Sequence, residues 1–89
     1  MEDRIALKIV TSAGVVFDRR VSYVSLPTTE GSVGILPDHA PMLCAVGRGV
    51  VRCRVEGKET ESIAVTQGVA SVEKNELTVL VEEARIAGC

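Results

Sequence analysis

His39 and Cys44 are the two side chains of this chain that could pair as a general base and a nucleophile. Cys44, however, belongs to the apolar segment 42–46, where burial raises the pKa of a thiol and keeps it unreactive. His39 is the only histidine, and a loop histidine beside an aspartate, here Asp38, is more often a structural hydrogen-bonding group than a catalyst. The sequence therefore argues against catalysis by this pair.

Acidic pairs and glycine-rich segments offer no better site. Glu59 with Glu61 and Glu82 with Glu83 are close in the sequence, but we expect both pairs to lie on solvated faces. The chain has no G-x-x-x-x-G-K-[ST] phosphate loop, and Ser32 lacks the flanking glycines of a nucleophile elbow. The sequence therefore predicts no catalytic residue and no cofactor.

The cysteines are Cys44, Cys53 and Cys89, an odd number with no C-x-x-C pair. A zinc site needs clustered His or Cys ligands, so no metal site is predicted. We expect Cys44 and Cys53 to be buried thiols in a reducing compartment, and Cys89 to be exposed at the end of the chain.

The composition favours one small β domain, residues 1–89. Hydrophobic residues make up 46% of the chain but only 2% are aromatic, so the core must be aliphatic, and β-branched valine suits pleated sheets. The net charge of −2 argues against nucleic acid, which binds basic surfaces. No apolar run is long enough to span a bilayer, and the charged, alternating N-terminus does not read as a signal peptide.

Short segments of alternating hydrophobicity, separated by turn residues, run along most of the sequence. They predict an all-β fold, a two-sheet antiparallel β-sandwich of about ten short strands, rather than a parallel α/β sheet. Pro27 should end the strand over 21–26, the apolar segment 42–46 should be covered on both faces, and 56–58 fits a hairpin loop. Only residues 82–87 allow a short helical turn. The predicted core consists of Ile5, Leu7, Ile9, Val51, Val55, Ile63, Val65, Leu77 and Val79.

The most punctuated segment is LPTTEGSVGILPDHAP, residues 26–41. It holds all three prolines, a G-x-x-G pair and the histidine, so the backbone must reverse twice between short apolar runs. Such loops place the polar residues Glu30, Ser32, Asp38 and His39 at their tips, where binding residues are often found.

Residues 28–41 of this segment, TTEGSVGILPDHAP, resemble the EG-x-x-GI-x-P-G-H-A-P signature of the epsilon subunit of F-type ATP synthases. Residues 11–18, 49–52, 68–72 and 77–80 also resemble strands of that family, so the resemblance covers nearly the whole chain. Two positions depart from it. The family usually has Gly at the position of Asp38, and often an acidic residue at that of Ser32.

The resemblance implies a non-catalytic subunit of the central rotor, which docks the gamma subunit to the membrane-embedded c-ring and couples proton flow to ATP synthesis. It implies a peripheral location on the cytoplasmic side of the bacterial inner membrane, reached through partners. Relatives continue into a two-helix hairpin, and we expect this chain to lack it. Met42, Leu43 and Val46 are candidates for an apolar gamma-facing surface. The residues expected to contact the ring or gamma are Glu30, Gly31, Ser32, Asp38, His39, Ala40, Pro41 and Met42.

Structural roles for the same residues remain open at this point. Gly31 and Gly34 can serve only to allow positive φ in turns, and His39 can be a turn-stabilising hydrogen bonder. Met42 and Leu43 can be core residues. The alternative function is a free-standing β-sandwich binding module that takes a peptide or small ligand, for example at a sheet edge.

Overall fold

Ten β-strands make up the regular structure of the part of the chain that the computed structural model describes, residues 4–55 and 60–86. The predicted hairpin loop at 56–58 and the position of Cys89 lie outside these residues. The strands are β1 (Ile5–Thr11), β2 (Gly14–Val21), β3 (Tyr23–Thr28), β4 (Gly31–Ile35), β5 (Met42–Val46), β6 (Gly49–Arg54), β7 (Thr60–Val65), β8 (Gly68–Glu73), β9 (Glu76–Val81) and β10 (Ala84–Ile86).

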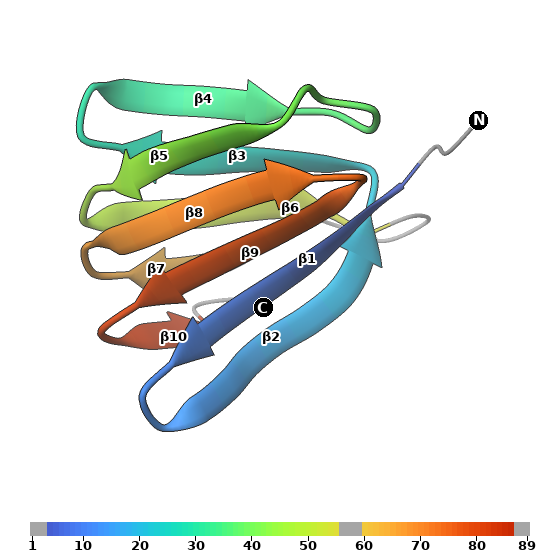
Figure 1. Cartoon of the computed structure of the whole chain (residues 1–89). Coiled ribbons are helices and arrows are strands. Elements are labelled where there is room, and N and C mark those ends of the chain that lie inside the picture. The colour runs from blue at the N-terminus through green and yellow to red at the C-terminus, as the bar shows by residue number, and fades with distance from the viewer. Residues whose placement is uncertain (1–3, 56–59, 87–89) are drawn as a thin grey trace.

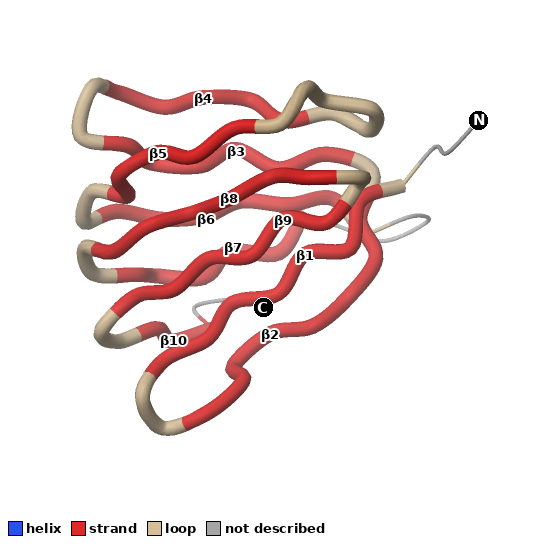
Figure 2. Tube along the Cα trace, viewed as in Figure 1, coloured by secondary structure: helices blue, strands red, loops and turns tan. Residues whose placement is uncertain are grey.

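The strands form two layers that are joined into one curled sheet (Figures 1 and 2). The strand order is β10-β7-β6-β3-β5-β8-β9-β1-β2, and β4 pairs with β3. The end strands β10 and β2 approach each other, with Cα atoms within 8 Å, so the sheet nearly closes on itself. Arg19 on β2 and Glu61 on β7 bridge this side with an N–O distance of 3.8 Å. The predicted all-β sandwich is confirmed, with one parallel pair, β1 with β9.

The two layers meet on β3, which changes partner along its length. Residues 23–25 pair with β6, whereas Thr28 lies opposite Val46 of β5. The Gly47 N–H donates to the Pro27 carbonyl (3.1 Å) and the Thr29 N–H to the Ala45 carbonyl (3.3 Å). In an antiparallel strand the N–H and C=O of one residue point toward the same edge. The missing N–H of Pro27 would therefore point to the edge of β3 that β6 and β5 share, at a position between these two strands, where no N–H is required. The prediction that Pro27 ends the strand was therefore wrong.

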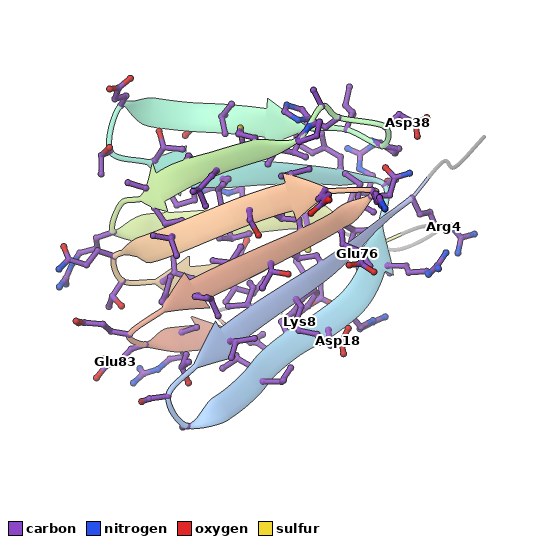
Figure 3. The ribbon with its side chains drawn as sticks, viewed as in Figure 1. Arg4, Lys8, Asp18, Asp38, Glu76 and Glu83 are labelled. Atoms are coloured by element: carbon purple, nitrogen blue, oxygen red, sulfur yellow. The ribbon has the colours of Figure 1, made fainter. Side chains whose placement is uncertain are left out.

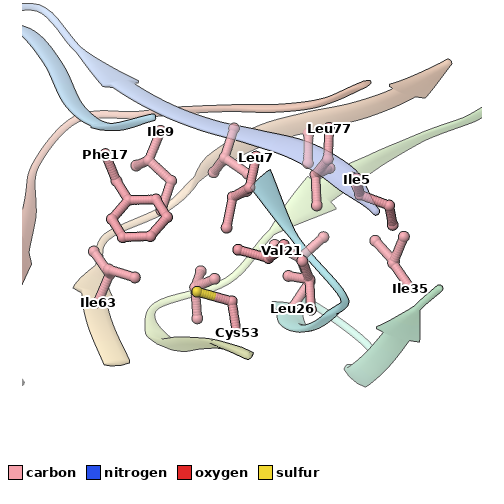
Figure 4. Packing of buried hydrophobic residues seen from close by; sticks show 14 of the residues in the cluster. Ile5, Leu7, Ile9, Phe17, Val21, Leu26, Ile35, Cys53, Ile63 and Leu77 are labelled. Carbon is pink, nitrogen blue, oxygen red and sulfur yellow. The ribbon is translucent and has the colours of Figure 1, made fainter. Parts of the chain in front are cut away.

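The core is mostly aliphatic, with the aromatic ring of Phe17 buried among branched side chains, and fills the space between the layers (Figure 4). All nine predicted core residues are buried, and so is Cys53, as expected, whereas Cys44 is only half-buried. Among the described residues no polar or charged side chain other than the Cys53 thiol is buried. Dense packing of branched side chains makes such an interior stiff.

Residues 82–87 were predicted to allow a helical turn, and this was wrong for the described part. Ala84–Ile86 form β10, which pairs antiparallel with Ile63–Val65 of β7. Thr66 prepares this pairing, since its N–H donates to the Glu83 carbonyl (3.0 Å) and its Oγ1 accepts from the Glu83 N–H (2.9 Å). Tertiary pairing thus overrides a weak local helical preference.

The prediction that segment 42–46 is covered on both faces was also wrong. In β5 the side chains alternate: Met42, Cys44 and Val46 turn toward the core, whereas Leu43 is 77% exposed. One face of β5 points to solvent, so only the other face packs against the opposite layer.

Replacing Val79 by alanine tests the strand register. Val79 is fully buried, so Val79→Ala should lower the free energy of unfolding by about 1–3 kcal/mol, because it removes two buried methyl groups and leaves a partial cavity. Its neighbour Leu80 is 48% exposed, so Leu80→Ala should cost clearly less. Urea denaturation measures both, and a larger loss for Leu80→Ala would contradict the register.

Deprotonation of the Cys53 thiol should make the folded chain less stable at alkaline pH. Burial raises the pKa of Cys53 from 9.0 to about 11, Glu61 adds to the rise and Arg19 opposes it. Between these values the unfolded chain loses the thiol proton and the folded chain keeps it, so stability falls as pH rises. We expect Cys53 to contribute a loss of about 2 kcal/mol from pH 9 to 11. Cys53→Val, which cannot titrate, should lack this contribution in denaturant titrations, and an unchanged pH profile would contradict it.

Candidate functional site

The residues predicted to contact partners lie at two opposite ends of the sandwich. The turns at residues 12–13, 29–30, 47–48, 66–67 and 82–83 share one end, and loop 36–41 and turn 74–75 share the other (Figure 1). Figure 3 shows Glu83 at the first end and Asp38 at the second. Strand β4 separates Glu30 from Asp38, so the structure does not bring all the predicted residues together. We call these two regions the turn end and the loop end.

At the turn end, the β3–β4 hairpin presents Glu30 to solvent. The Thr28 side chain shapes this hairpin, because its Oγ1 accepts from the Glu30 N–H (3.1 Å) and donates to the Gly31 carbonyl. Gly31 has φ +115°, a conformation that side-chain-bearing residues rarely adopt, so the expected need for glycine is confirmed there. Ser32 follows and is also exposed.

Gly34 has a different role from the one considered for it. Its φ is not positive, and a Cβ there would lie 3.1 Å from the Tyr23 hydroxyl oxygen. The Tyr23 ring therefore packs across the backbone of β4 at Gly34, and glycine leaves room for it.

The turn end is also rich in acidic side chains. Glu82 and Glu83 are exposed in the turn before β10, and the Glu82 N–H donates to the Gln67 carbonyl (3.4 Å), which ties two turns together. Arg48 is an exposed cation at the same end. An open groove of about 760 Å³ runs between these turns and β10, with Arg48, Glu82, Glu83 and Arg85 among its lining residues. The end thus offers exposed charge of both signs.

At the loop end, the backbone of loop 36–41 is held in a defined conformation. Asp38 has φ +67°, the left-handed region, which explains why a glycine suits this position in the sequences that the chain resembles. The His39 N–H donates to the Leu36 carbonyl (3.2 Å). His39 Nδ1 lies 2.7 Å from the Ala40 carbonyl oxygen, which can only accept, so Nδ1 donates. His39 is therefore a turn-stabilising hydrogen bonder in this structure.

Side chains on the outer surface of β5 and its neighbours form a third surface that sequence analysis largely missed. Met42 packs partly against the core and Val46 is buried, so of the three apolar candidates only Leu43 is fully exposed. Beside it, cross-strand partners form one apolar row over five strands. The outer row consists of Ala45, Val69, Leu80, Val10 and Val15. Val69 is 46% and Leu80 48% exposed, and their place in one continuous row, rather than singly on the surface, makes this surface a candidate interface.

Neither catalysis nor metal binding gains support from the described residues. Burial raises the pKa of the half-buried Cys44 thiol, and the His39 ring is engaged with the Ala40 carbonyl. No three His, Cys, Asp or Glu side chains in residues 4–55 and 60–86 are grouped as metal ligands. The same residues contain no helix with the length and hydropathy of a membrane span.

Comparison with known proteins gives the family. Residues 4–87 match the model of the β-sandwich domain of the ATP synthase delta/epsilon chain. The chain belongs to this family. It is 43% identical to the ATP synthase epsilon chain of Carboxydothermus hydrogenoformans over 84 residues, which cover 94% of this chain and 62% of the relative. It is 44% identical to the ATP synthase epsilon chain of Synechocystis over 82 residues, which cover 92% of this chain and 60% of the relative. The chain thus spans about 60% of the length of these curated relatives.

Solved structures share the fold of this ATP synthase delta/epsilon domain. A chain of the Euglena gracilis mitochondrial ATP synthase structure containing OSCP, F1 and c-ring superposes with a TM-score of 0.89 at 19% identity, covering 97% of this chain and 55% of that one. A chain of the Tetrahymena thermophila mitochondrial ATP synthase structure of the central stalk and c-ring superposes with a TM-score of 0.73 at 17% identity. The superposition covers 90% of this chain and 64% of that one. At these identities the likeness concerns the fold.

Proposed function

We propose that this chain is the sandwich part of an epsilon subunit, a non-catalytic component of the central stalk of an F-type ATP synthase. Its task is to hold the gamma subunit to the c-ring, so that rotation driven by proton flow reaches the catalytic sites. The observation that carries the proposal is family membership over residues 4–87 together with a stiff aliphatic core between exposed docking surfaces. The epsilon-chain relatives and the central-stalk structure support it.

The three surfaces suit different partners. Exposed charge at the turn end, above all Glu30, suits the polar loops of the c-ring, because rim charges set register and association rate. The outer row with Leu43 suits an apolar face of gamma, since exposed apolar patches mark interfaces. The loop end, with His39, Ala40 and Pro41, then lies at the margin of the gamma contact. The protein is peripheral, on the cytoplasmic side of the bacterial inner membrane, and takes no cofactor.

The turn-end contact is tested by reversing the charge of Glu30. Glu30→Lys should weaken binding to synthase that has been stripped of its epsilon subunit, and the defect should shrink as salt screens the contact. The Glu30 side chain is exposed in a turn, so the change should alter stability by at most about 0.5 kcal/mol. Pull-down across a salt series measures binding and thermal melting measures stability. Asp18→Lys, at an exposed aspartate in the middle of β2 and away from both ends, is the matched control, and an equal defect in it would contradict the assignment.

The outer row and the adjoining Leu43 are tested by placing charge on both. Leu43→Asp with Leu80→Asp should abolish binding to isolated gamma, because two carboxylates would lose hydration in an apolar contact. Both side chains are about half exposed or more, so the fold should persist. Arg52→Asp, an exposed position on the outer surface of β6, is the matched control and should bind normally. Normal gamma binding by the double variant, measured by surface plasmon resonance, would move the gamma contact to another surface.

A further inference from the structure

Two loops far apart in the sequence are joined by a reciprocal hydrogen-bonded pair at the loop end. The Asp38 N–H donates to Asn75 Oδ1, and Asn75 Nδ2 donates to Asp38 Oδ1 over 3.1 Å. Each residue therefore both gives and accepts a hydrogen bond, an arrangement that also fixes which way the Asn75 amide points. We call this pair the clasp.

Asn75 is itself held firmly by its surroundings. Lys74 and Asn75 have φ of +53° and +61° in the two-residue turn between β8 and β9, a turn type in which asparagine is favoured. The Asn75 carbonyl accepts the Ala6 N–H of β1 (2.9 Å). Its backbone is therefore tied to a hairpin and to the neighbouring strand, so its side chain is a fixed anchor.

Asp38, in contrast, sits in a loop with few other restraints. It is exposed and has a left-handed backbone conformation, which is unfavourable for a residue with a side chain. Besides the clasp, two hydrogen bonds hold this loop: the His39 N–H donates to the Leu36 carbonyl, and the His39 ring donates to the Ala40 carbonyl. Asp38 directly precedes His39, so its backbone angles set the direction in which His39 leaves the loop.

We propose that Asn75 is a positioning residue for the partner-contact loop 36–41. Through the clasp it holds Asp38 in its left-handed conformation and thereby presents His39, Ala40 and Pro41 in the geometry that docks. The role of the loop as a contact rests on the proposed function, whereas the ordering of the loop by Asn75 does not. Turn 74–75 thus supports the proposed contact of loop 36–41 with a partner, although nothing in the sequence of the turn indicates this role.

The first test uses the isolated chain. Asn75→Asp places two carboxylates face to face and removes the Nδ2 donor, so amide hydrogen exchange over residues 38–40 should become about tenfold faster, as expected for loss of one hydrogen-bonded pair. The double variant Asp38→Asn with Asn75→Asp moves the side-chain donor to position 38, so that the carboxylate at position 75 can accept from both the side-chain amide and the backbone N–H of position 38. It has the composition and net charge of the parent and should restore slow exchange. Unchanged exchange in Asn75→Asp, or no rescue by the exchanged pair, would overturn the ordering role.

The second test measures docking on epsilon-stripped synthase. Asn75→Asp should weaken binding several-fold and the exchanged pair should restore it, with Glu76→Gln as a control for altered charge at the same end. If the parent chain binds and Asn75→Asp loosens the loop without weakening binding, the positioning role in docking is overturned. If the parent chain itself does not bind, the proposed function fails, while the exchange result on the isolated chain still decides whether Asn75 orders the loop.

Discussion

A single strand, β3, belongs to both layers of the sandwich, and the change of partner along it shapes the molecule. Its first residues pair with β6, and its last residue lies opposite Val46 of β5. Pro27 stands between the two partners, where no N–H is required, and its carbonyl still accepts from Gly47. This corner folds one sheet over itself, so that side chains from both layers enclose an aliphatic core. Without it the apolar faces of the two layers would remain open to water.

The same corner decides where the exposed turns and loops lie. Because successive strands reverse direction, five turns lie at one end of the sandwich, and loop 36–41 lies beside turn 74–75 at the other. The end strands β2 and β10 close the opposite side, helped by Arg19 and Glu61, an exposed ion pair that adds little stability by itself. The result is a stiff block whose surfaces are held at fixed positions relative to one another. This property suits the proposed role between two partners.

Much of the fold could be predicted from the sequence because alternation reports burial directly. Ile5, Leu7 and Ile9 alternate with less buried neighbours, and all three are in the core. Prediction failed where both faces of a strand are apolar. In β5 the apolar run does not show which side chains point outward, and the outer row across β5, β8, β9, β1 and β2 became visible only from the register of paired strands. It also failed at residues 84–86, where pairing with β7 overrides local preference.

The candidate site was predicted only in part. The turn and loop tips around Glu30 and His39 follow from proline and glycine placement, which acts locally. Their separation to opposite ends depends on β4 being a strand of its own, and the Asp38–Asn75 clasp joins residues that no local rule connects. Asn75 could be predicted as a turn residue, yet its second role depends on tertiary structure. Long-range contacts of this kind set the precision of the site, whereas sequence pattern sets its location.

Hydroxyl-radical footprinting of the chain, alone and bound to epsilon-stripped synthase, decides which surfaces the partners cover. With partners on the outer row, on the adjoining Leu43 and at the loop end, Leu80, Leu43 and His39 should lose reactivity on binding. Tyr23, which is 39% exposed on the other layer, should keep its reactivity. Protection of Tyr23 with undiminished oxidation of Leu43 and Leu80 would show that the chain docks through the opposite layer, and would contradict the account.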